Sequence, residues 1–377
     1  MQAGHPFARA LTGSAVLWLL GPGFVTGQTP TDLAAASGEA IYQASCANCH
    51  GPLGTGLDRS LLGFEEELPD FTDCRFASRE PDADWVAIAH EGGPVRGFSQ
   101  MMPAFKGALD PEQLGRVVTY IRTLCGDDEW PRGELNLPRA LVTEKAFPED
   151  EWVIEADGAL EGDGDISSAF VYEKRFGARS MVEVVIPYGW RQMPVEGSAE
   201  LDWVGGLGDV VLGVKHAAYH SFEAGRIFSL GAEVALPTGE ETKGLGADGA
   251  KGEAYASFGQ AFGDAFLQAQ VGAEVPFYDG GETEGFGRLA LGRTWTSGPW
   301  GRAWTPMVEV AAVRELEGGV STDLDVIPQI QASLNTRQHV LANVGLRVPA
   351  TNTSGRSMQL LVYLLLDWFD GGFFEGW

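Results

Sequence analysis

The chain has 377 residues, enough for two domains. Acidic residues outnumber basic ones by 52 to 26, which gives a formal net charge of −26. This balance argues against binding to nucleic acid, which needs a basic surface, and suits a soluble partner with a basic surface or a cationic substrate.

The first 27 residues have the pattern of an export signal. Arg9 supplies a positive charge, and the apolar stretch after it is too short to span a bilayer. Small residues around Gly27 offer a cleavage site. No later stretch is apolar over eighteen residues, so no transmembrane helix is expected. We therefore predict a signal peptide over residues 1–27 and an exported protein.

The sequence CANCH places Cys46, Cys49 and His50 within five residues. Two thiols at this spacing reach the two vinyl groups of one haem, and the adjacent histidine points at the iron. The alternatives are a redox C-x-x-C motif and half of a zinc site. A zinc site needs two more ligands at matching spacing, and neither a second C-x-x-C nor a paired histidine follows. The motif predicts one covalently attached haem c.

Residues 28–130 around this motif have the pattern of a small helical domain. Helix formers predict a first helix over residues 33–50. A second is expected over 81–93, which starts with proline and aspartate and stops at two glycines. The third is expected over 110–124, with Asp110 as N-cap and apolar residues at helical spacing.

This part of the chain resembles class I c-type cytochromes over roughly residues 30–125. It has C-x-x-C-H after a first helix and M-P-x-F before a terminal helix. In that family the methionine before the proline is the distal haem ligand, which implies that His50 and Met102 ligate the iron. Met101 is the rival, and Pro103, which fixes the chain just after Met102, favours Met102.

A methionine ligand favours ferrous iron and leaves no open iron position, which suits electron transfer. The sequence therefore indicates an electron carrier more than an enzyme, although it does not decide between them. The remaining cysteines, Cys74 and Cys125, are expected to form a disulfide because the domain is exported. A disulfide between them would close a loop of about fifty residues and stabilise the domain by roughly 4 kcal/mol.

A polar segment with three prolines, residues 131–150, is expected to be a linker. After it, apolar and polar residues alternate, which predicts β-strands with one apolar and one polar face. We expect about twelve strands in residues 151–377, near 152–160, 167–175, 180–189, 208–219, 225–237, 251–262, 264–277, 284–296, 302–314, 323–334, 338–349 and 357–368.

An even number of strands about ten residues long, apolar outward and polar inward, is typical of an outer-membrane β-barrel. The expected fold is therefore an all-α cytochrome c domain followed by an antiparallel barrel. A soluble β-sandwich, with its apolar faces turned to a shared core, is the alternative.

In its domain arrangement, the chain resembles the fused cytochrome–porins of iron-oxidising bacteria. Two barrel segments, GGLGDVVLGVKH and EVALPTGEETKG, loosely resemble the outer-membrane transporter family associated with phenol-degradation pathways. Wide channels need about sixteen strands, so a twelve-stranded barrel could not enclose the haem domain. The cytochrome domain is expected at the periplasmic mouth, with the barrel in contact with outer-membrane lipid.

Three functions remain open at this point. The first is a haem c electron-transfer protein that exchanges electrons with a periplasmic redox protein or with a small substrate reaching the barrel mouth. The second is a transporter whose cytochrome domain gates or oxidises what passes. In the third, the barrel only tethers the carrier to the membrane.

The alternation also predicts which side chains face the lumen. Glu183, Glu233, Glu274 and Glu309 are expected to point inward from four strands, with Lys215 among the opposing charges. An open lumen with excess carboxylates would be weakly cation-selective. Paired charges that close the barrel are the alternative.

Overall fold

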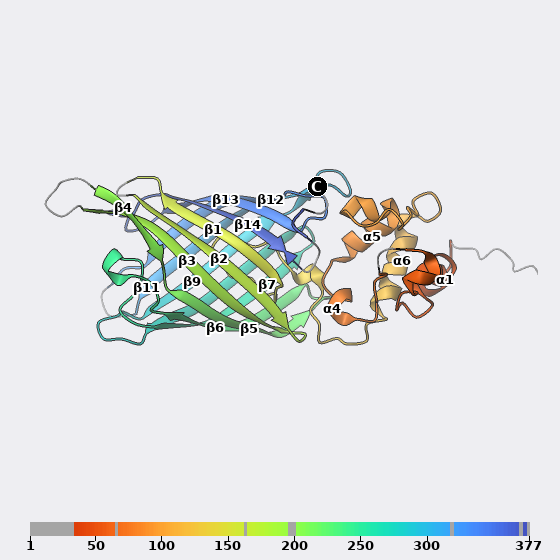
Figure 1. Cartoon of the computed structure of the whole chain (residues 1–377), viewed down its shortest axis with the longest axis horizontal. Coiled ribbons are helices and arrows are strands. Elements are labelled where there is room, and N and C mark those ends of the chain that lie inside the picture. Colours follow the sequence, from red (N-terminus) through yellow and green to blue (C-terminus); the bar gives the residue numbers. More distant parts are fainter. Residues whose placement is uncertain are drawn as a thin grey trace, which may run out of the picture.

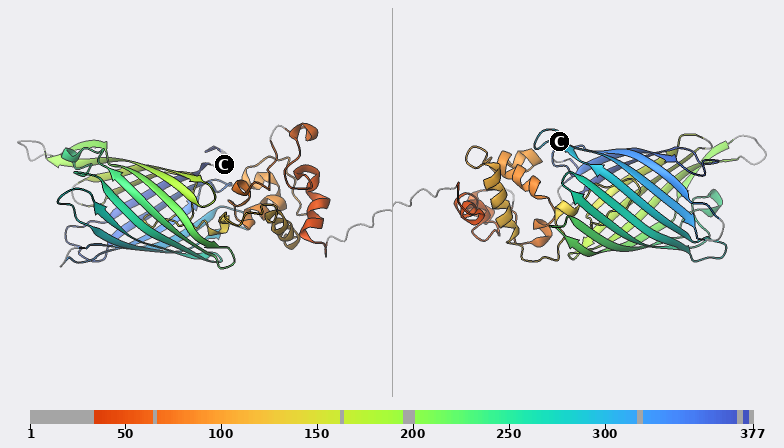
Figure 2. Two further views of the ribbon diagram at one scale, coloured as in Figure 1. Left: turned by 90° about the horizontal axis from the view of Figure 1, so that it is seen from below. Right: turned by 180° about the vertical axis from the view of Figure 1, so that it is seen from behind.

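The computed structural model describes residues 34–64, 67–161, 164–194, 201–316, 320–368 and 372–374. The predicted signal peptide lies outside them. None of the helices in these ranges is long and apolar enough to cross a membrane. A helical domain and a barrel lie end to end along the long axis of the molecule (Figure 1), and two further views show the same arrangement (Figure 2).

The helical domain contains the three predicted helices and several short ones. The first predicted helix is divided at Cys46 into two, and the other two form as expected. The elements are α1 (Gly38–Ser45), α2 (Ala47–His50), α3 (Arg59–Leu62), α4 (Cys74–Ala77), α5 (Asp82–Glu91), η1 (Gly93–Arg96), α6 (Pro111–Arg122) and η2 (Gly133–Leu135).

Helices α1 and α6 cross at very close range and form the core of this domain. Apolar residues of both helices are buried in one cluster. At Gly38 an added Cβ would lie 2.0 Å from the carbonyl oxygen of Arg116, so only glycine allows this approach. The rings of Tyr42 and Tyr120 meet beside it, with centroids 5.3 Å apart. The crossing therefore depends on a residue without a side chain.

The predicted disulfide between Cys74 and Cys125 is confirmed. It joins α4 to the residues that follow α6, with a sequence separation of 51 and the Cα atoms of the two cysteines 5.1 Å apart. The end of α6 is thereby tied to the start of a short helix far back in the sequence.

The second domain is a closed antiparallel barrel of twelve strands, as predicted. The ring closes where β1 pairs with β14, and β11 pairs with β9. Its strands are β1 (Glu151–Ala159), β2 (Asp165–Phe176), β3 (Ser180–Pro194), β5 (Val210–Ser221), β6 (Arg226–Leu236), β7 (Lys251–Phe262), β8 (Ala265–Pro276), β9 (Glu284–Arg293), β11 (Ala303–Glu315), β12 (Asp323–Ser333), β13 (Val340–Pro349) and β14 (Gln359–Asp367).

Two short strands extend this ring. β4 (Leu201–Leu207) pairs with the end of β3, and β10 (Trp295–Thr296) pairs with the start of β11. The cytochrome end of the barrel has short turns such as 177–179 and 263–264. The opposite end has longer connections, including 237–250 with η3 (Glu241–Lys243), and we call it the loop end (Figure 1).

The barrel is apolar outside and polar inside. Many large apolar side chains are exposed on the strands, among them Ile154, Val214 and Leu291. Polar side chains such as Glu173 and Gln268 are instead buried. This is the reverse of a soluble β-sandwich, in which apolar side chains fill the core. The sandwich alternative is therefore excluded.

The cytochrome domain is docked on the barrel through the turns at its mouth. Arg96 donates to the carbonyl oxygen of Trp300 at 2.6 Å. Arg337, in the turn between β12 and β13, donates to the carbonyl oxygens of Arg96 and Gly97 at 3.1 and 2.7 Å. The Arg337 guanidinium also lies 4.3 Å from the ring centre of Phe98. These contacts fix the domain outside the barrel.

Candidate functional site

The CANCH motif begins with Cys46, at the tight turn between α1 and α2, and its other four residues form α2. The amides of Cys49 and His50 both donate to the carbonyl oxygen of Cys46, at 3.1 and 3.0 Å. These bonds hold Cys46, Cys49 and His50 within one helical turn. Cys46 and Cys49 are half-buried and not joined to each other.

His50 lies in an apolar environment beneath this turn. Its ring stacks on Phe71, with centroids 4.9 Å apart. Burial lowers the pKa of His50 to about 4, so the imidazole is neutral, which is the form that binds metal. The loop after the motif folds back onto it, and the Gly56 amide donates to the His50 carbonyl oxygen at 2.9 Å. Main-chain bonds therefore fix the position of the histidine.

The two candidate methionines differ in exposure. Met101 is 55% exposed, whereas Met102 is half-buried. The Met102 amide donates to Ser99, and its carbonyl oxygen accepts from Gly93, so its backbone is held from both sides. A ligand must be at least partly buried, and of the two Met102 is the more buried. This arrangement favours the prediction of Met102 as ligand, which remains a prediction.

The residues of this turn fit a covalently attached haem. Two unbonded thiols stand three positions apart beside a neutral imidazole. The Nδ1 atom of His50 is buried and has no hydrogen-bond partner in the described part of the chain. His90 is the other histidine of the cytochrome domain. It contacts Glu91 at 3.0 Å and the ring of Trp300, so it belongs to the contact with the barrel.

Comparison with known proteins identifies this domain. Residues 33–121 match the family described as cytochrome C oxidase, cbb3-type, subunit III. Cytochrome c-554(547) of Halothiobacillus neapolitanus is 33% identical over 94 residues, which are 24% of this chain and 96% of the relative. Cytochrome c6 of Anabaena variabilis is 31% identical over 86 residues, 22% of this chain and 85% of the relative. The domain is therefore a cytochrome c, and through it the chain belongs to the cytochrome c family.

A longer relative matches over the same part only. The cbb3-type cytochrome c oxidase subunit FixP of Bradyrhizobium diazoefficiens is 30% identical over 96 residues, 24% of this chain. The chain spans only 28% of the length of FixP. The similarity thus ends with the cytochrome domain and does not reach the barrel.

Solved structures resemble the barrel only distantly. The NanC porin structure has a TM-score of 0.39 at 7% identity and covers 57% of this chain and 98% of its own. LpxR from Salmonella typhimurium has a TM-score of 0.35 at 10% identity, with coverages of 57% and 99%. The description of the barrel rests on its strand pairing and not on these similarities.

The segment expected to be only a linker also fills part of the barrel. We call residues 133–150 the lumen segment. It enters the barrel from the cytochrome end, turns near Val142 and returns to β1, and most of it is buried. Hydrogen bonds or ion pairs join it to β1, β2, β3, β5, β6, β8, β9, β11, β12, β13 and β14.

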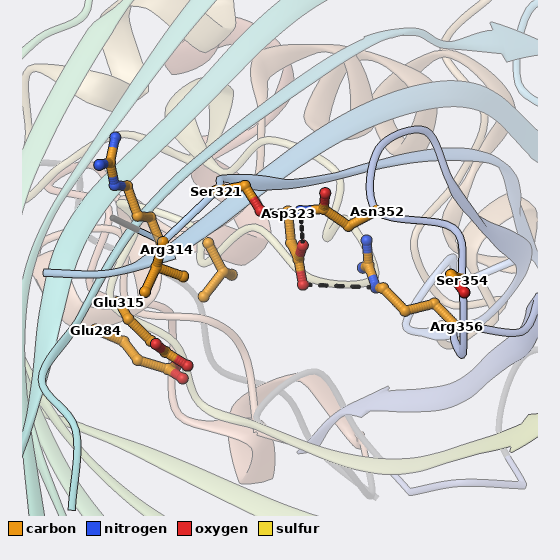
Figure 3. A pocket seen from close by; sticks show the side chains of 10 residues that line it. Glu284, Arg314, Glu315, Ser321, Asp323, Asn352, Ser354 and Arg356 are labelled. Atoms are coloured by element: carbon orange, nitrogen blue, oxygen red, sulfur yellow. Dashed lines mark hydrogen bonds and ion pairs between the residues drawn. The ribbon is translucent and has the colours of Figure 1, made fainter. Parts of the chain in front are cut away.

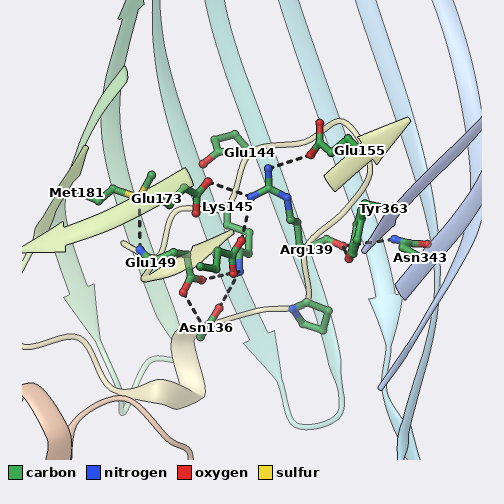
Figure 4. A network of polar contacts seen from close by, with 12 residues as sticks. Asn136, Arg139, Glu144, Lys145, Glu149, Glu155, Glu173, Met181, Asn343 and Tyr363 are labelled. Atoms are coloured by element: carbon green, nitrogen blue, oxygen red, sulfur yellow. Dashed lines mark hydrogen bonds and ion pairs between the residues drawn. The ribbon is translucent and has the colours of Figure 1, made fainter. Parts of the chain in front are cut away.

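Two buried cations anchor this segment (Figure 4). Arg139 contacts Glu151 and Glu173 at 3.0 Å each, and Glu155 at 3.2 Å. Lys145 contacts Glu149 at 2.5 Å and Glu151 at 3.3 Å. A buried charge is tolerated only when paired, so these contacts fix the segment in the lumen.

The tip of the lumen segment is held by main-chain bonds. The amides of Val142 and Thr143 donate to Glu309 at 3.2 and 2.7 Å, and the Glu144 amide donates to Gln270 at 3.1 Å. Lys215 forms an ion pair with Glu144.

The prediction that four glutamates face the lumen holds for all four. Glu309 bonds to the lumen segment directly. Glu183, Glu233 and Glu274 each share a strand face with a residue that contacts it. Of the two interpretations of the lumen that the sequence left open, the structure favours the one with paired charges, because the lumen segment and its ion pairs occupy the cytochrome end. No sequence signal revealed this, since the segment is polar, rich in proline and without periodicity.

The loop end of the lumen contains a polar cavity. It has a volume of about 330 Å³ and is lined by charged side chains that include Glu284, Arg314, Asp323 and Arg356 (Figure 3). Arg356 and Asp323 form an ion pair at its edge, at 3.6 Å. The two ends of the lumen therefore differ, because one contains the lumen segment and the other contains this cavity.

Proposed function

We propose that this protein is an electron carrier with a single haem c, which its barrel holds at the outer membrane. Cys46 and Cys49 are the attachment points, and His50 and Met102 are the axial ligands. When bound, haem c supplies reversible one-electron chemistry. Phe71 packs against His50 and fixes the plane of its ring. The CANCH turn, with its neutral imidazole, is the observation that carries this proposal.

The experiment is a haem analysis of the purified protein. Mass spectrometry is expected to find one haem that survives denaturation, and the pyridine haemochrome spectrum is expected to have the thioether form. Cys46→Ala with Cys49→Ala is expected to release the haem. A haem that dissociates from the unchanged protein on denaturation would contradict covalent attachment.

We further propose that the barrel spans the outer membrane with the cytochrome domain in the periplasm. The support is the apolar exterior and the placement of the short turns, because outer-membrane barrels have short periplasmic turns and longer external loops. A membrane-impermeant amine reagent should label Lys243, at the loop end, in intact cells. Lys106, on the cytochrome domain, should react only after the outer membrane is opened. The reverse order of labelling would overturn this orientation.

The proposed partner is a periplasmic redox protein with a basic surface. The chain has twice as many acidic as basic residues, and complementary charge accelerates encounter. Electron transfer to such a partner should slow as salt rises, because salt screens the attraction. A rate that is independent of salt would contradict a partner recognised by charge.

Among the three candidate functions, the lumen segment favours a barrel that anchors the carrier. Eleven strands hold this segment, which therefore lies in the path of a solute at the cytochrome end. The transporter alternative requires the segment to leave. Planar bilayers that contain the unchanged protein are expected to show no steady conductance, and an open channel would restore the transporter alternative.

A further inference from the structure

A set of aromatic rings connects the candidate haem ligand to the surface of the cytochrome domain. The ring of Phe71 stacks on His50, with centroids 4.9 Å apart, and meets the ring of Trp85 of α5 at 5.3 Å. The ring of Phe76, on α4, lies 5.7 Å from that of Trp85 and 6.5 Å from that of Phe71. We call Phe71, Trp85 and Phe76 the aromatic bridge. Phe71 is only 6% exposed and Phe76 is 45% exposed, so the bridge begins in the core and ends in solvent.

Packed rings of this kind provide a path for an electron. Tunnelling between a donor and an acceptor weakens steeply with distance, and it weakens more across an empty gap than through atoms in contact. The aromatic bridge offers continuous contacts from His50, the proposed iron ligand, to the side chain of Phe76. An electron donated at Phe76 therefore has a packed route to the iron.

A cation beside the bridge keeps one of its rings from being oxidised. The guanidinium of Arg122 lies 4.4 Å from the ring centre of Trp85. Arg122 is almost buried, and it contacts Asp82 at 2.8 Å. A cation over the face of an indole is attracted by its electrons, which makes it harder to remove an electron from the ring. The electron therefore passes Trp85 by tunnelling, and no radical is left on the ring.

The surface around Phe76 is acidic. The disulfide between Cys74 and Cys125 brings residues 125–129 alongside the start of α4. Residues 70–76 and 125–129 contain one exposed basic side chain, Arg75, and these exposed acidic ones: Asp70, Asp73, Asp127, Asp128 and Glu129. A surface of this charge attracts and orients a partner of the opposite charge. Phe76 is thus an exposed ring with an acidic border.

We propose that the protein exchanges electrons with its redox partner at Phe76, through the aromatic bridge. This inference rests on the proposed function, because it takes His50 to be the iron ligand of an electron carrier. The partner is a redox protein with a basic surface around its own prosthetic group. The acidic border orients this partner, so that its prosthetic group meets Phe76. One electron moves in each encounter, from the partner to ferric iron or from ferrous iron to the partner, and no bond or proton is transferred.

The experiment measures electron transfer to the ferric full-length protein from photoexcited zinc-substituted mitochondrial cytochrome c, which is a basic protein. The excited probe loses one electron and the iron gains it, so transient absorption gives the rate. Phe76→Leu is expected to slow the transfer by about tenfold, because the contacts of the last ring are lost. Phe76→Tyr keeps a ring and should retain the rate.

The acidic border is tested separately. Asp73→Asn combined with Asp128→Asn is expected to slow the transfer by about threefold and to reduce its dependence on salt, because both changes remove charges that attract the probe. Glu112→Gln is the matched control, since Glu112 is an exposed glutamate at the start of α6, at the end of the helix away from Cys125. It should leave the rate unchanged.

Phe98→Leu is the control for the ring, because Phe98 is 41% exposed on the same domain and lies against Arg337. The haem spectrum and the reduction potential verify that the haem site is intact in every variant. If Phe76→Leu accepts electrons as fast as the unchanged protein, the carrier function stands and this exchange site is wrong. An equal loss in Phe98→Leu or Glu112→Gln also overturns the site. An unchanged protein that contains haem but accepts no electron overturns both the site and the proposed function.

Discussion

At the scale of single residues, the choice between two adjacent methionines determines the chemistry of the haem site. A thioether ligand raises the reduction potential of the iron and leaves it six-coordinate. Met102 is half-buried and its backbone is held by Ser99 and Gly93, whereas Met101 faces solvent. The exposure of the two side chains thus agrees with the sequence argument from Pro103.

Met102→Ala is expected to abolish the weak charge-transfer absorption at the red end of the ferric spectrum and to lower the reduction potential. The cause is loss of the thioether ligand from the iron. Met101→Ala is the matched control and should leave both unchanged. Optical redox titration measures both effects, and damage from Met101→Ala alone would show that the ligand is misassigned.

Single residues were predictable where local chemistry determines their role. The spacing of Cys46 and Cys49 implies the haem, and strand alternation placed Glu309 inside the barrel. Arg139 was not predictable, because its partners Glu151 and Glu173 lie on strands that only the closed barrel brings around it. Periodicity identifies the face of a strand, but it does not show what fills the space that a closed sheet encloses.

At the scale of elements, two contacts determine the shape of the protein. One is the crossing of α1 and α6, which depends on Gly38. The other is the lumen segment, which depends on the ion pairs of Arg139. The elements themselves followed from the sequence, since the helices and the twelve barrel strands have the expected order. The lumen segment did not, because it lacks both periodicity and regular structure.

Gly38→Ala is expected to destabilise the cytochrome domain by about 1–3 kcal/mol, because its methyl group would collide with the Arg116 carbonyl and push the helices apart. Gly115→Ala is the control, since a Cβ there meets nothing within 4 Å. That change in a helix interior should stabilise by about 1 kcal/mol. Chemical denaturation followed at the haem absorption measures both, and equal effects would mean that the helices do not touch at Gly38.

Arg139→Ala is expected to cost about 3–5 kcal/mol of barrel stability, because it leaves buried Glu151 and Glu173 without their cation. The loosened lumen segment should also allow conductance in planar bilayers, with a preference for cations. Arg191→Ala, which removes a half-exposed ion pair with Asp165, is the control and should change neither the stability of the barrel nor its conductance. If Arg139→Ala is as stable as the control and shows no conductance, these ion pairs do not hold the segment.

At the scale of the whole molecule, the cytochrome domain is attached to the barrel mouth and does not hang from a flexible linker. Arg337 and Trp300 come from barrel turns, and both contact the chain around Arg96. The sequence predicted the order of the two domains and that the barrel is too narrow to enclose the haem domain. It did not predict their attachment, because turn residues that meet across domains follow no periodic pattern.

Arg337→Ala is expected to speed amide hydrogen exchange in residues 92–99, because it removes two bonds to the Arg96 and Gly97 carbonyls and uncovers Phe98. The haem spectrum should not change. Arg302→Ala, at an exposed arginine of the same mouth, should leave exchange unaltered. Exchange measured by mass spectrometry tests this, and unchanged protection in Arg337→Ala would argue that the docking does not depend on it.

The position of the lumen segment in the chain restricts how the protein can be assembled. It follows the cytochrome domain and precedes β1, yet the strands after it surround it, and β14 closes the ring by pairing with β1. The segment enters and leaves by the cytochrome end, so it can fill the lumen only from the side that carries the haem domain. A folded haem domain is too large for the bore of a twelve-stranded barrel, so it stays on the side by which the lumen segment enters. Haem attachment must take place on that same side.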